Sequence, residues 1–271
     1  IAQFAKALEK TGDYNTFLKR SENWRNVYDT QSTFMRPKLK DGSFVSSFIP
    51  KEYSTYFCES NAWQYFWSVQ HNIEGLAEIV GGNEKLSEKL DAMFSLNPLP
   101  EDKLPIFSTG MIGQYAHGNE PSHHVAYLYN YIKKPWKTQK LIREILETQY
   151  KNEPNGHCGN EDCGQMSSWY VFSALGFYPV NPAQGVYAFG SPIVDSAVIR
   201  LEKGKIFTVK TINNSLENKY IQSISLNGKS IKRNYITHKE IMKGCTLVFT
   251  MGKSPNKDIK NTMATSSIVY Y

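Results

Sequence analysis

The stretch Leu175-Gly-Phe-Tyr-Pro-Val180 marks the point at which the hydrophobic periodicity of the chain changes. Before it, apolar residues recur at the three- and four-residue spacing of amphipathic helices. After it, apolar and polar residues alternate, as they do in half-buried strands. We therefore expect a mostly α-helical chain with a β region, divided into a helical part over residues 1–182 and a strand-rich part over residues 183–271.

The helical part contains several segments of helical spacing with typical boundary signals. Gly12 follows the first expected helix, Gly81-Gly82 follows the third, Pro121 opens one helix and Pro135 precedes the next. The expected helices cover residues 1–11, 13–29, 61–80, 84–95, 121–133, 137–150 and 164–175.

Three loops in this part, residues 36–60, 97–120 and 151–163, are longer than helix packing requires. Long loops on a helical scaffold are where function tends to be found. Helix pairs joined alternately by short and long loops are typical of a toroid of helical hairpins with its long loops over a central pocket. A plain helical bundle or a solenoid would show the same periodicity, so the content of the loops has to decide.

The strand-rich part shows short alternating segments separated by turn residues such as Asn227-Gly228. This pattern predicts a small antiparallel β-sandwich. The expected strands cover residues 185–189, 196–200, 206–210, 221–225 and 246–250.

The composition is that of a globular protein, with 41% hydrophobic and 21% charged residues among 271. A net charge of +6 is compatible with an anionic partner, but basic and acidic residues are interleaved, which favours a mildly basic surface and no nucleic-acid binding. No stretch of about 18 apolar residues is present, so we expect no membrane insertion. The chain opens inside an amphipathic helix, Ile1-Ala-Gln-Phe-Ala-Lys-Ala-Leu8, without a start methionine, which indicates a piece of a longer protein.

Four cysteines are too few and too scattered for a disulfide framework in a chain of this size. Cys158 and Cys163 could bridge locally. Together with His157 they also look like half of a zinc site, but the second ligand pair at the usual spacing is missing.

Three loop-to-helix segments combine a carboxylate with amide, histidine and aromatic side chains: residues 57–65, 117–124 and 157–166. Taken singly, Glu59, Glu120 and Asp162 could each serve as a helix cap or turn residue. Three such junctions, all dense in polar side chains, are better explained by a shared polar pocket.

The inventory of this pocket favours carbohydrate chemistry. Ser122 beside His123 and His124 is only a sequence neighbour of a base, and no glycine-rich loop with lysine is present for phosphate. Paired carboxylates among Trp, Tyr, Asn and Gln instead fit glycoside hydrolysis, in which one carboxylic acid protonates the leaving oxygen and another carboxylate activates water.

The chain resembles glycoside hydrolase family 92 in several long motifs. They are Glu59-Ser-Asn-Ala-Trp-Gln-Tyr65, Gly113-Gln-Tyr-Ala-His-Gly-Asn-Glu-Pro-Ser-His-His124, Gly159-Asn-Glu-Asp-Cys-Gly-Gln-Met-Ser-Ser-Trp-Tyr170 and Ala174-Leu-Gly-Phe-Tyr-Pro179. Flanking segments such as Phe34-Met-Arg36 and Gly190-Ser-Pro192 agree, so the resemblance covers nearly the whole chain.

This resemblance implies a calcium-dependent, inverting exo-α-mannosidase acting on mannose-containing glycans, and export to a periplasm or cell surface. It also implies an N-terminal β-sandwich followed by an (α/α)6 toroid with further β structure. The chain then corresponds to the later toroid helices and a small antiparallel β-sandwich region, and the N-terminal sandwich of the parent protein is its missing partner. We expect the segment alone to be poorly active.

The resemblance assigns Glu59 as the general acid and Asp162 as the general base. As the acid, Glu59 must be protonated at the working pH, which burial beside other negative charge would favour. For inversion the two carboxyl groups should lie roughly 6.5–9.5 Å apart, with room for the attacking water.

The remaining site residues are also carried over from the resemblance. Calcium prefers hard oxygen ligands, for which Asn119 and Glu120 are the candidates, with Gln64 and Gln165 as further oxygens. The expected sugar-binding residues are Trp63, His117, Asn160 and Gln165.

Some positions depart from the family pattern. Asn160 stands where many members have an acidic residue two positions before the base, and Ser60 replaces a usual glycine. Members selective for α-1,2 links carry a His-Glu pair shortly before a Thr-Gly step, whereas Ile106-Phe107-Ser108 precedes Thr109-Gly110 here, which disfavours α-1,2 specificity. One rival is a non-catalytic carbohydrate-binding fragment or pseudo-enzyme, against which retention of both Glu59 and Asp162 argues. A second rival is a purely structural helical module, against which the three polar junction segments argue.

Overall fold

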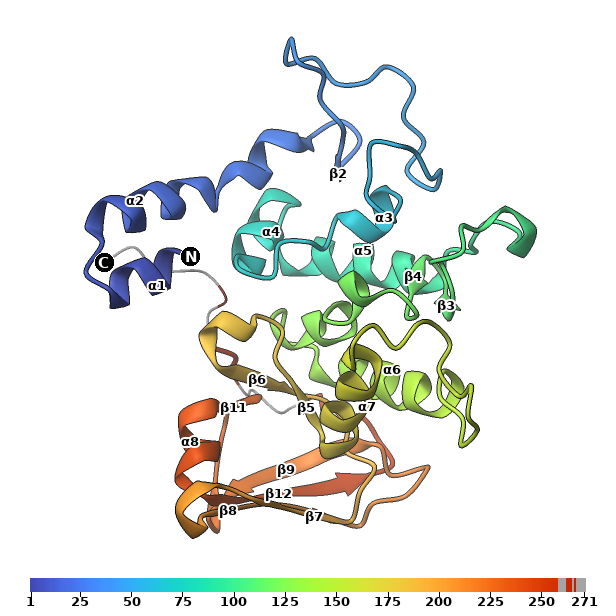
Figure 1. Cartoon of the computed structure of the whole chain (residues 1–271). Coiled ribbons are helices and arrows are strands. Elements are labelled where there is room, and N and C mark those ends of the chain that lie inside the picture. Colours follow the sequence, from blue (N-terminus) through green and yellow to red (C-terminus); the bar gives the residue numbers. More distant parts are fainter. Residues whose placement is uncertain (258–261, 265, 267–271) are drawn as a thin grey trace. The chain divides into compact units, whose positions relative to one another are not determined.

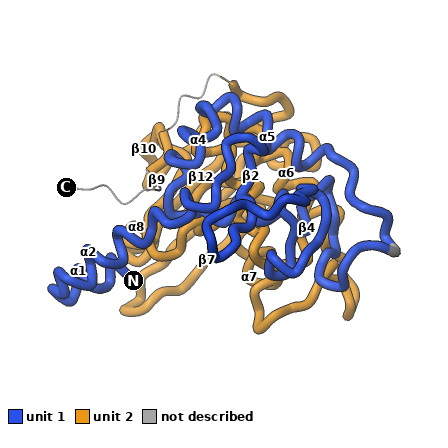
Figure 2. The backbone as a smooth tube through the Cα atoms, turned by 90° about the horizontal axis from the view of Figure 1, so that it is seen from above, with its two compact units in different colours: residues 1–116, 266–271 blue, residues 117–265 orange. Residues whose placement is uncertain are grey.

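The computed structural model describes residues 1–257, 262–264 and 266 of the chain. The chain forms two compact units, shown in different colours in Figure 2. Unit 1 comprises residues 1–116 and 266–271, and unit 2 comprises residues 117–265. These units follow compactness, not the change of periodicity, so the division at residue 182 stays a prediction.

Unit 1 consists of helices and two very short hairpins (Figure 1). Its core lies around Phe66, Trp67, Leu86 and Leu90, none of which is more than 1% exposed. The elements are α1 (Ala2–Ala7), α2 (Thr11–Arg20), the 3-10 helix η1 (Asn23–Val27), β1 (Tyr28–Asp29), β2 (Phe34–Met35), α3 (Ala62–Tyr65), α4 (Ile73–Ile79), α5 (Asn83–Ser95), η2 (Glu101–Lys103), β3 (Met111–Ile112) and β4 (Tyr115–Ala116).

The first helix boundary is wrong in the sequence prediction. Gly12 lies inside the first turn of α2, because the chain already turns at Glu9, which takes the left-handed conformation with a φ of 57°. The boundary at Gly81 and Gly82 is confirmed: both adopt a positive φ, and Gly82 is the N-cap of α5.

The single helix expected over residues 61–80 is instead two helices, α3 and α4. Asn72 interrupts it, because its side chain accepts a hydrogen bond from the backbone N–H of Gly75 at 2.9 Å and so starts a new helix. Ser266 is bound at the same end of α4, where its hydroxyl accepts from the N–H of Ile73 at 2.6 Å and its own N–H donates to Glu74 at 2.8 Å.

Unit 2 combines helices with two sheets whose facing residues form one core. Phe177 lies 5.9 Å from Phe207 and Phe189 lies 5.1 Å from Phe249 between ring centroids, one ring of each pair from each sheet. The elements are η3 (Glu120–Ser122), η4 (Val125–Asn130), α6 (Pro135–Thr148), α7 (Gln165–Leu175), β5 (Phe177–Tyr178), η5 (Pro182–Gln184), β6 (Val186–Phe189), β7 (Ser196–Arg200), η6 (Glu202–Gly204), β8 (Ile206–Ile212), β9 (Tyr220–Leu226), β10 (Lys229–Ser230), β11 (Tyr235–Thr237), α8 (His238–Lys243) and β12 (Cys245–Gly252).

The five expected strands are confirmed as β6, β7, β8, β9 and β12. Strand β12 shows why the pattern is readable: every second residue from Cys245 to Met251 is buried. The hairpin at Asn227-Gly228 is also present, with φ values of 50° and 76° that suit a turn with two left-handed residues.

The prediction of purely antiparallel pairing is wrong for one pair of strands, β12 and β8. The larger sheet has the order β10-β9-β12-β8-β7, in which β12 pairs parallel with β8. The long connection through β9, β11 and α8 returns β12 to the middle of the sheet in the direction of β8, and local alternation carries no information about such pairing.

The segment over residues 121–133 forms 3-10 helices instead of an α-helix. Side chains take up its carbonyls: Thr138 Oγ1 donates to the carbonyl of Ala126 at 2.8 Å, and Asn130 Nδ2 donates to that of Tyr127 at 3.1 Å. The next helix, α6, begins at Pro135 itself, where a proline is favoured.

Among the described residues, no helix is long and apolar enough to cross a membrane.

Candidate active site

Glu59, the expected general acid, lies in unit 1 just before α3. Its backbone is left-handed, with a φ of 49°, and its side chain is exposed, so the burial that we expected is absent. It is not the cap of α3 either. Asn61 takes that place, accepting from the backbone N–H of Gln64 while the Gln64 side chain accepts from the N–H of Asn61 in a capping box.

A network of amide and hydroxyl groups fixes this junction in place. Asn61 Nδ2 donates to Gln114 Oε1 at 3.1 Å, and Gln64 Nε2 donates to the backbone carbonyl of Gln114 at 3.2 Å. Gln64 Nε2 also donates to the Tyr53 hydroxyl at 3.0 Å, to which Ser108 donates at 2.8 Å. Tyr53 and Gln114 were not predicted from the sequence, since a lone residue in a long loop carries no signal. Gln64 is committed to this network, which favours a structural role for it over a calcium ligand.

Trp63, an expected sugar-binding residue, is half-buried in α3. Its ring packs edge-on against Phe34 at 4.8 Å between centroids. The ammonium of Lys89 lies 3.5 Å from the Phe34 centroid, 4.5 Å from that of Phe66 and 5.2 Å from that of Trp63. Burial lowers the pKa of Lys89 to about 8.

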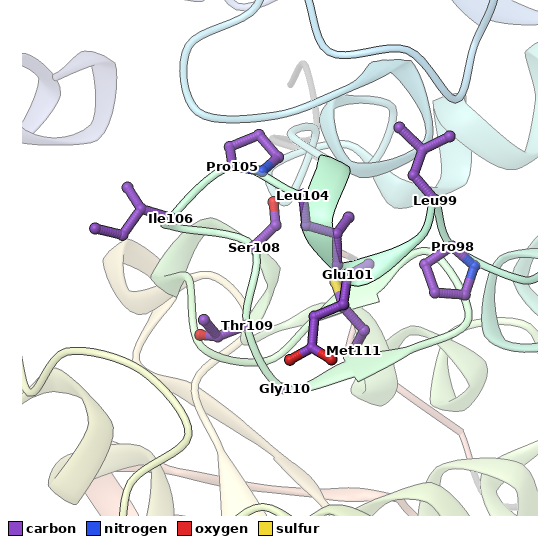
Figure 3. A pocket seen from close by; sticks show the side chains of 10 residues that line it. All are labelled: Pro98, Leu99, Glu101, Leu104, Pro105, Ile106, Ser108, Thr109, Gly110 and Met111. Carbon is purple, nitrogen blue, oxygen red and sulfur yellow. The ribbon is translucent and has the colours of Figure 1, made fainter.

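Unit 1 also contains a pocket of about 570 Å³ formed by a single loop segment (Figure 3). Most of its lining is apolar, and the side chain of Ile106 is 94% exposed. The hydroxyl of Thr109 is buried without a hydrogen-bond partner in the described part of the chain. The lining residues are Pro98, Leu99, Glu101, Leu104, Pro105, Ile106, Ser108, Thr109, Gly110 and Met111.

Unit 2 contains a buried group of polar and aromatic side chains that we call the histidine cluster. It includes His117, which is 0% exposed, and His123, which is 1% exposed. His117 Nε2 lies 2.8 Å from the Tyr150 hydroxyl, and its ring lies 4.4 Å from that of Trp169. Gln165 Nε2 lies 3.1 Å from His123 Nδ1 and 3.2 Å from the Tyr178 hydroxyl. The members are His117, His123, Tyr150, Gln165, Trp169 and Tyr178.

Both histidines of the cluster are neutral. Burial, and then the repulsion that two protonated rings would have, hold the pKa of His117 beside His123 well below its usual value, and burial lowers the pKa of His123 to about 4. His123 Nε2 lies 3.0 Å from the His117 carbonyl, which can only accept, so Nε2 carries the proton and Nδ1 accepts from the Gln165 amide. The cluster therefore orients the Gln165 amide instead of transferring protons.

Asp162, the expected general base, is exposed at the end of the loop before α7. Asp162, Cys163 and Gly164 have φ values of 48°, 58° and 94°, so three successive residues are left-handed. Such a conformation is unfavourable for residues other than glycine and clusters at functional positions. Asn160 is exposed two residues earlier in the same loop.

A backbone contact holds this loop beside the segment with the expected calcium ligands. A Cβ atom on Gly159 would lie 2.3 Å from the carbonyl oxygen of Gly118 and 2.5 Å from its Cα, so only glycine fits there. Asn119 and Glu120 follow Gly118 directly, at the start of η3. Within unit 2, the structure thus brings together the 119–120 segment and the 159–162 loop.

All four cysteines of the chain are free thiols, Cys58 and Cys163 being exposed and Cys245 buried. Burial raises the pKa of Cys158 to about 11. Among the residues that the structure describes, no three His, Cys, Asp or Glu side chains are grouped so as to hold a metal ion.

Comparison with known proteins assigns the family. The model of the glycosyl hydrolase family 92 catalytic domain matches residues 1–253, and the chain belongs to this family. An uncharacterized secreted glycosidase of Arthroderma benhamiae is 30% identical over 281 aligned positions, which cover 93% of this chain and 34% of that protein.

Solved structures agree with this assignment. A family GH92 α-mannosidase from Bacteroides thetaiotaomicron is 38% identical over 96% of this chain and 34% of its own, with a TM-score of 0.88. Its complex with mannoimidazole gives a TM-score of 0.92. A second GH92 protein of that organism, described as an inverting mannosidase, is 37% identical with a TM-score of 0.86 over 96% of this chain and 36% of its own. The chain thus spans about a third of the length of the relatives it matches.

Proposed function

We propose that this chain carries the acid and base of a calcium-dependent, inverting exo-α-mannosidase that hydrolyses terminal α-mannosidic bonds of glycans. The observation that carries the proposal is the similarity, at 38% identity and a TM-score of 0.92, to an α-mannosidase solved with mannoimidazole. The description of a second similar protein as an inverting mannosidase supports the stereochemical outcome.

Glu59 acts as the general acid that protonates the leaving oxygen. The capping box of α3 and the amide network to Gln114 hold the backbone next to it, which supports a fixed position for its carboxyl group. Asp162 acts as the general base that takes a proton from the attacking water. The distance between the two carboxyl groups stays a prediction.

Calcium fits the donors on the 119–120 segment. Asn119 offers an amide oxygen and Glu120 a carboxylate, both hard oxygen ligands of the kind that calcium takes, and Asn119 is only 9% exposed. When bound, calcium supplies positive charge that anchors and polarises sugar hydroxyls. Glu120 and Asn119 would hold it, and the Gly118–Gly159 contact keeps their segment beside the loop of Asp162.

The proposed sugar-binding side chains come from the 57–65 segment and the 157–166 segment. Trp63 offers an aromatic face, and Asn160 and Gln165 offer amides. His117 is fully buried, so we give it a positioning role, through Tyr150, in place of direct sugar contact. We also propose, as the resemblance implies, that the helical part over residues 1–182 belongs to an (α/α)6 toroid and that the parent protein carries an N-terminal β-sandwich.

The pocket of unit 1 supports the prediction on linkage. Ile106 and Leu104 lie in its lining close to the Thr109-Gly110 step, and none of the described lining residues is a histidine. This composition agrees with the sequence prediction, which rests on the missing His-Glu pair and disfavours α-1,2 specificity. Secretion of the protein is supported by the description of its fungal relative as a secreted glycosidase.

Proton NMR of an α-mannobiose digest by the full-length protein, with calcium and again with EDTA, tests the proposal. We expect β-mannose to appear before mutarotation, only with calcium, and to be lost in Glu59→Gln and Asp162→Asn. Glu153→Gln, an exposed carboxylate in the same loop as Asp162, is the matched control. Absence of mannose release for every linkage, with retained mannan binding, would replace the enzyme by a carbohydrate-binding protein.

A further inference from the structure

Glu161, which no motif argument assigned, lies directly before the proposed base. Its carboxylate accepts from the backbone N–H of Ser167 at 3.1 Å and from the Ser167 hydroxyl at 2.9 Å. The same carboxylate pairs with His157 Nδ1 at 2.8 Å. Although burial alone would raise the pKa of Glu161, the two hydrogen bonds from Ser167 and the charge of His157 lower it, so the group is ionised at neutral pH.

These contacts give Glu161 the task of capping α7. The N-cap position is Gly164, which has no side chain to accept from the first turn, and Ser167 is the third residue of the helix. Glu161 supplies the missing acceptor from three residues further back, where a carboxylate also complements the helix dipole. The left-handed residues Asp162, Cys163 and Gly164 lie between the carboxylate and the N–H that it binds.

The other side of the loop is fixed as well. His157, the ion-pair partner of Glu161, forms a backbone bridge with Tyr150, whose hydroxyl meets the buried His117. Gly159 rests on Gly118. Glu161 therefore joins the start of α7 to His157 in the middle of the loop, and Asp162 lies in the turn between these two contacts.

We infer that Glu161 is a positioning residue that holds the left-handed turn of Asp162 in its reactive geometry, an inference that rests on the proposed function of Asp162. Without the carboxylate, the turn is closed onto α7, among the described contacts, only by two long backbone hydrogen bonds, from the N–H of Gln165 to the carbonyl of Asp162 at 3.4 Å and from the N–H of Met166 to the carbonyl of Glu161 at 3.3 Å. We expect the turn to be held less firmly in that variant. A shift of about 1 Å in the carboxylate of Asp162 would lower the rate of the reaction by about 100-fold. Because Asp162 acts on the attacking water and not on the bound sugar, substrate binding should change far less than turnover.

The test compares kcat and KM on an aryl α-mannoside with calcium, in the full-length protein. Glu161→Ala should lower kcat about 10- to 100-fold, with KM changed less than about threefold. Glu161→Gln keeps an oxygen for the Ser167 N–H and should restore kcat to within about fivefold of wild type. Glu153→Gln should behave as wild type, and thermal unfolding of each variant reports on folding.

The outcomes separate the inference from the proposed function. If Asp162→Asn is inactive while Glu161→Ala keeps wild-type kcat, the positioning role is wrong and the base assignment stands. If Asp162→Asn retains full activity, the proposed function itself fails. Should Glu161→Ala not fold, Ser167→Ala, which removes only the hydroxyl donor, must still lower kcat by about threefold or more; a wild-type kcat there overturns the inference.

Discussion

Replacement of Gly159 by alanine tests whether the contact between the 159–162 loop and the 118–120 segment sets the geometry of the site. The added Cβ would lie 2.3 Å from the carbonyl oxygen of Gly118, whereas ordinary contacts begin at 3.4 Å. Both partners are backbone, so neither can rotate away. The two segments must therefore separate by about 1 Å to reach an ordinary contact distance.

The expected size of the effect follows from this displacement. Overpacking of this kind costs about 1–3 kcal/mol in unfolding free energy. A shift of about 1 Å between Asp162 and the oxygens of Glu120, the proposed calcium ligand, should lower kcat about 100-fold. We would measure kcat on an aryl α-mannoside, the calcium concentration for half-maximal activity, and the denaturant midpoint.

Gly12→Ala is the matched control. A Cβ on Gly12 would meet no atom within 4 Å, and the residue lies in the first turn of α2 with ordinary helical backbone. Alanine there should be neutral or stabilise the protein by up to about 1 kcal/mol. Wild-type kcat and calcium dependence in Gly159→Ala would refute the view that this backbone contact sets the site.

Three further outcomes follow from charges in the two units. The pKa of His123 is lowered to about 4, so its neutral form stabilises the fold fully above the usual value near 6.5 and less as pH falls from there toward 4. We expect His123 to contribute about 3 kcal/mol to the loss of stability over this window, so His123→Gln should lose about 3 kcal/mol less than wild type between pH 7 and pH 4 in denaturant titrations. Lys89, with a pKa of about 8, should change the fluorescence of Trp63 as pH rises from 7 to 9, and Lys89→Met should abolish that change. Removal of calcium by EDTA should abolish mannosidase activity, and added calcium but not magnesium should restore it. Glu120→Gln should raise the calcium concentration needed for half-maximal activity about tenfold or more, measured by titrating the activity with free calcium.

The fold could be predicted wherever one residue pattern decides the structure. The alternating pattern predicted β12 correctly because every second residue of this strand is buried. Gly81-Gly82 predicted a helix boundary correctly because both residues take a positive φ, which glycine adopts without strain. The break at Asn72 and the parallel pairing of β12 depend on hydrogen bonds and connections that periodicity does not encode.

In the candidate site, too, the sequence predicts residue types and their order but not the contacts that the fold creates. The motifs identified Glu59 and Asp162 by residue type and order, which is information that a sequence holds. The capping role of Asn61, the burial of His117 and the ion pair of His157 with Glu161 depend on which side chains the fold brings together. Neither did the sequence reveal that both proposed catalytic residues have left-handed backbones, because neither is a glycine.

That conformation leads to a last prediction, at Cys163. A left-handed residue other than glycine or asparagine costs about 1–2 kcal/mol, and the exposed Cys163, with a φ of 58°, carries this cost beside Asp162. Cys163→Asn should raise the unfolding free energy by about 0.5–1 kcal/mol, since asparagine tolerates the same angles, and should leave kcat unchanged because the turn is kept.

The same substitution at Cys58, an exposed cysteine with ordinary backbone, should change stability by less than about 0.5 kcal/mol. A stabilised Cys163→Asn variant with normal turnover would mean that the turn geometry, and not its strain, serves the reaction. A stabilised variant with much lower kcat would mean that the reaction uses mobility of the turn, and the rigid positioning of Asp162 by Glu161 would then be the wrong picture.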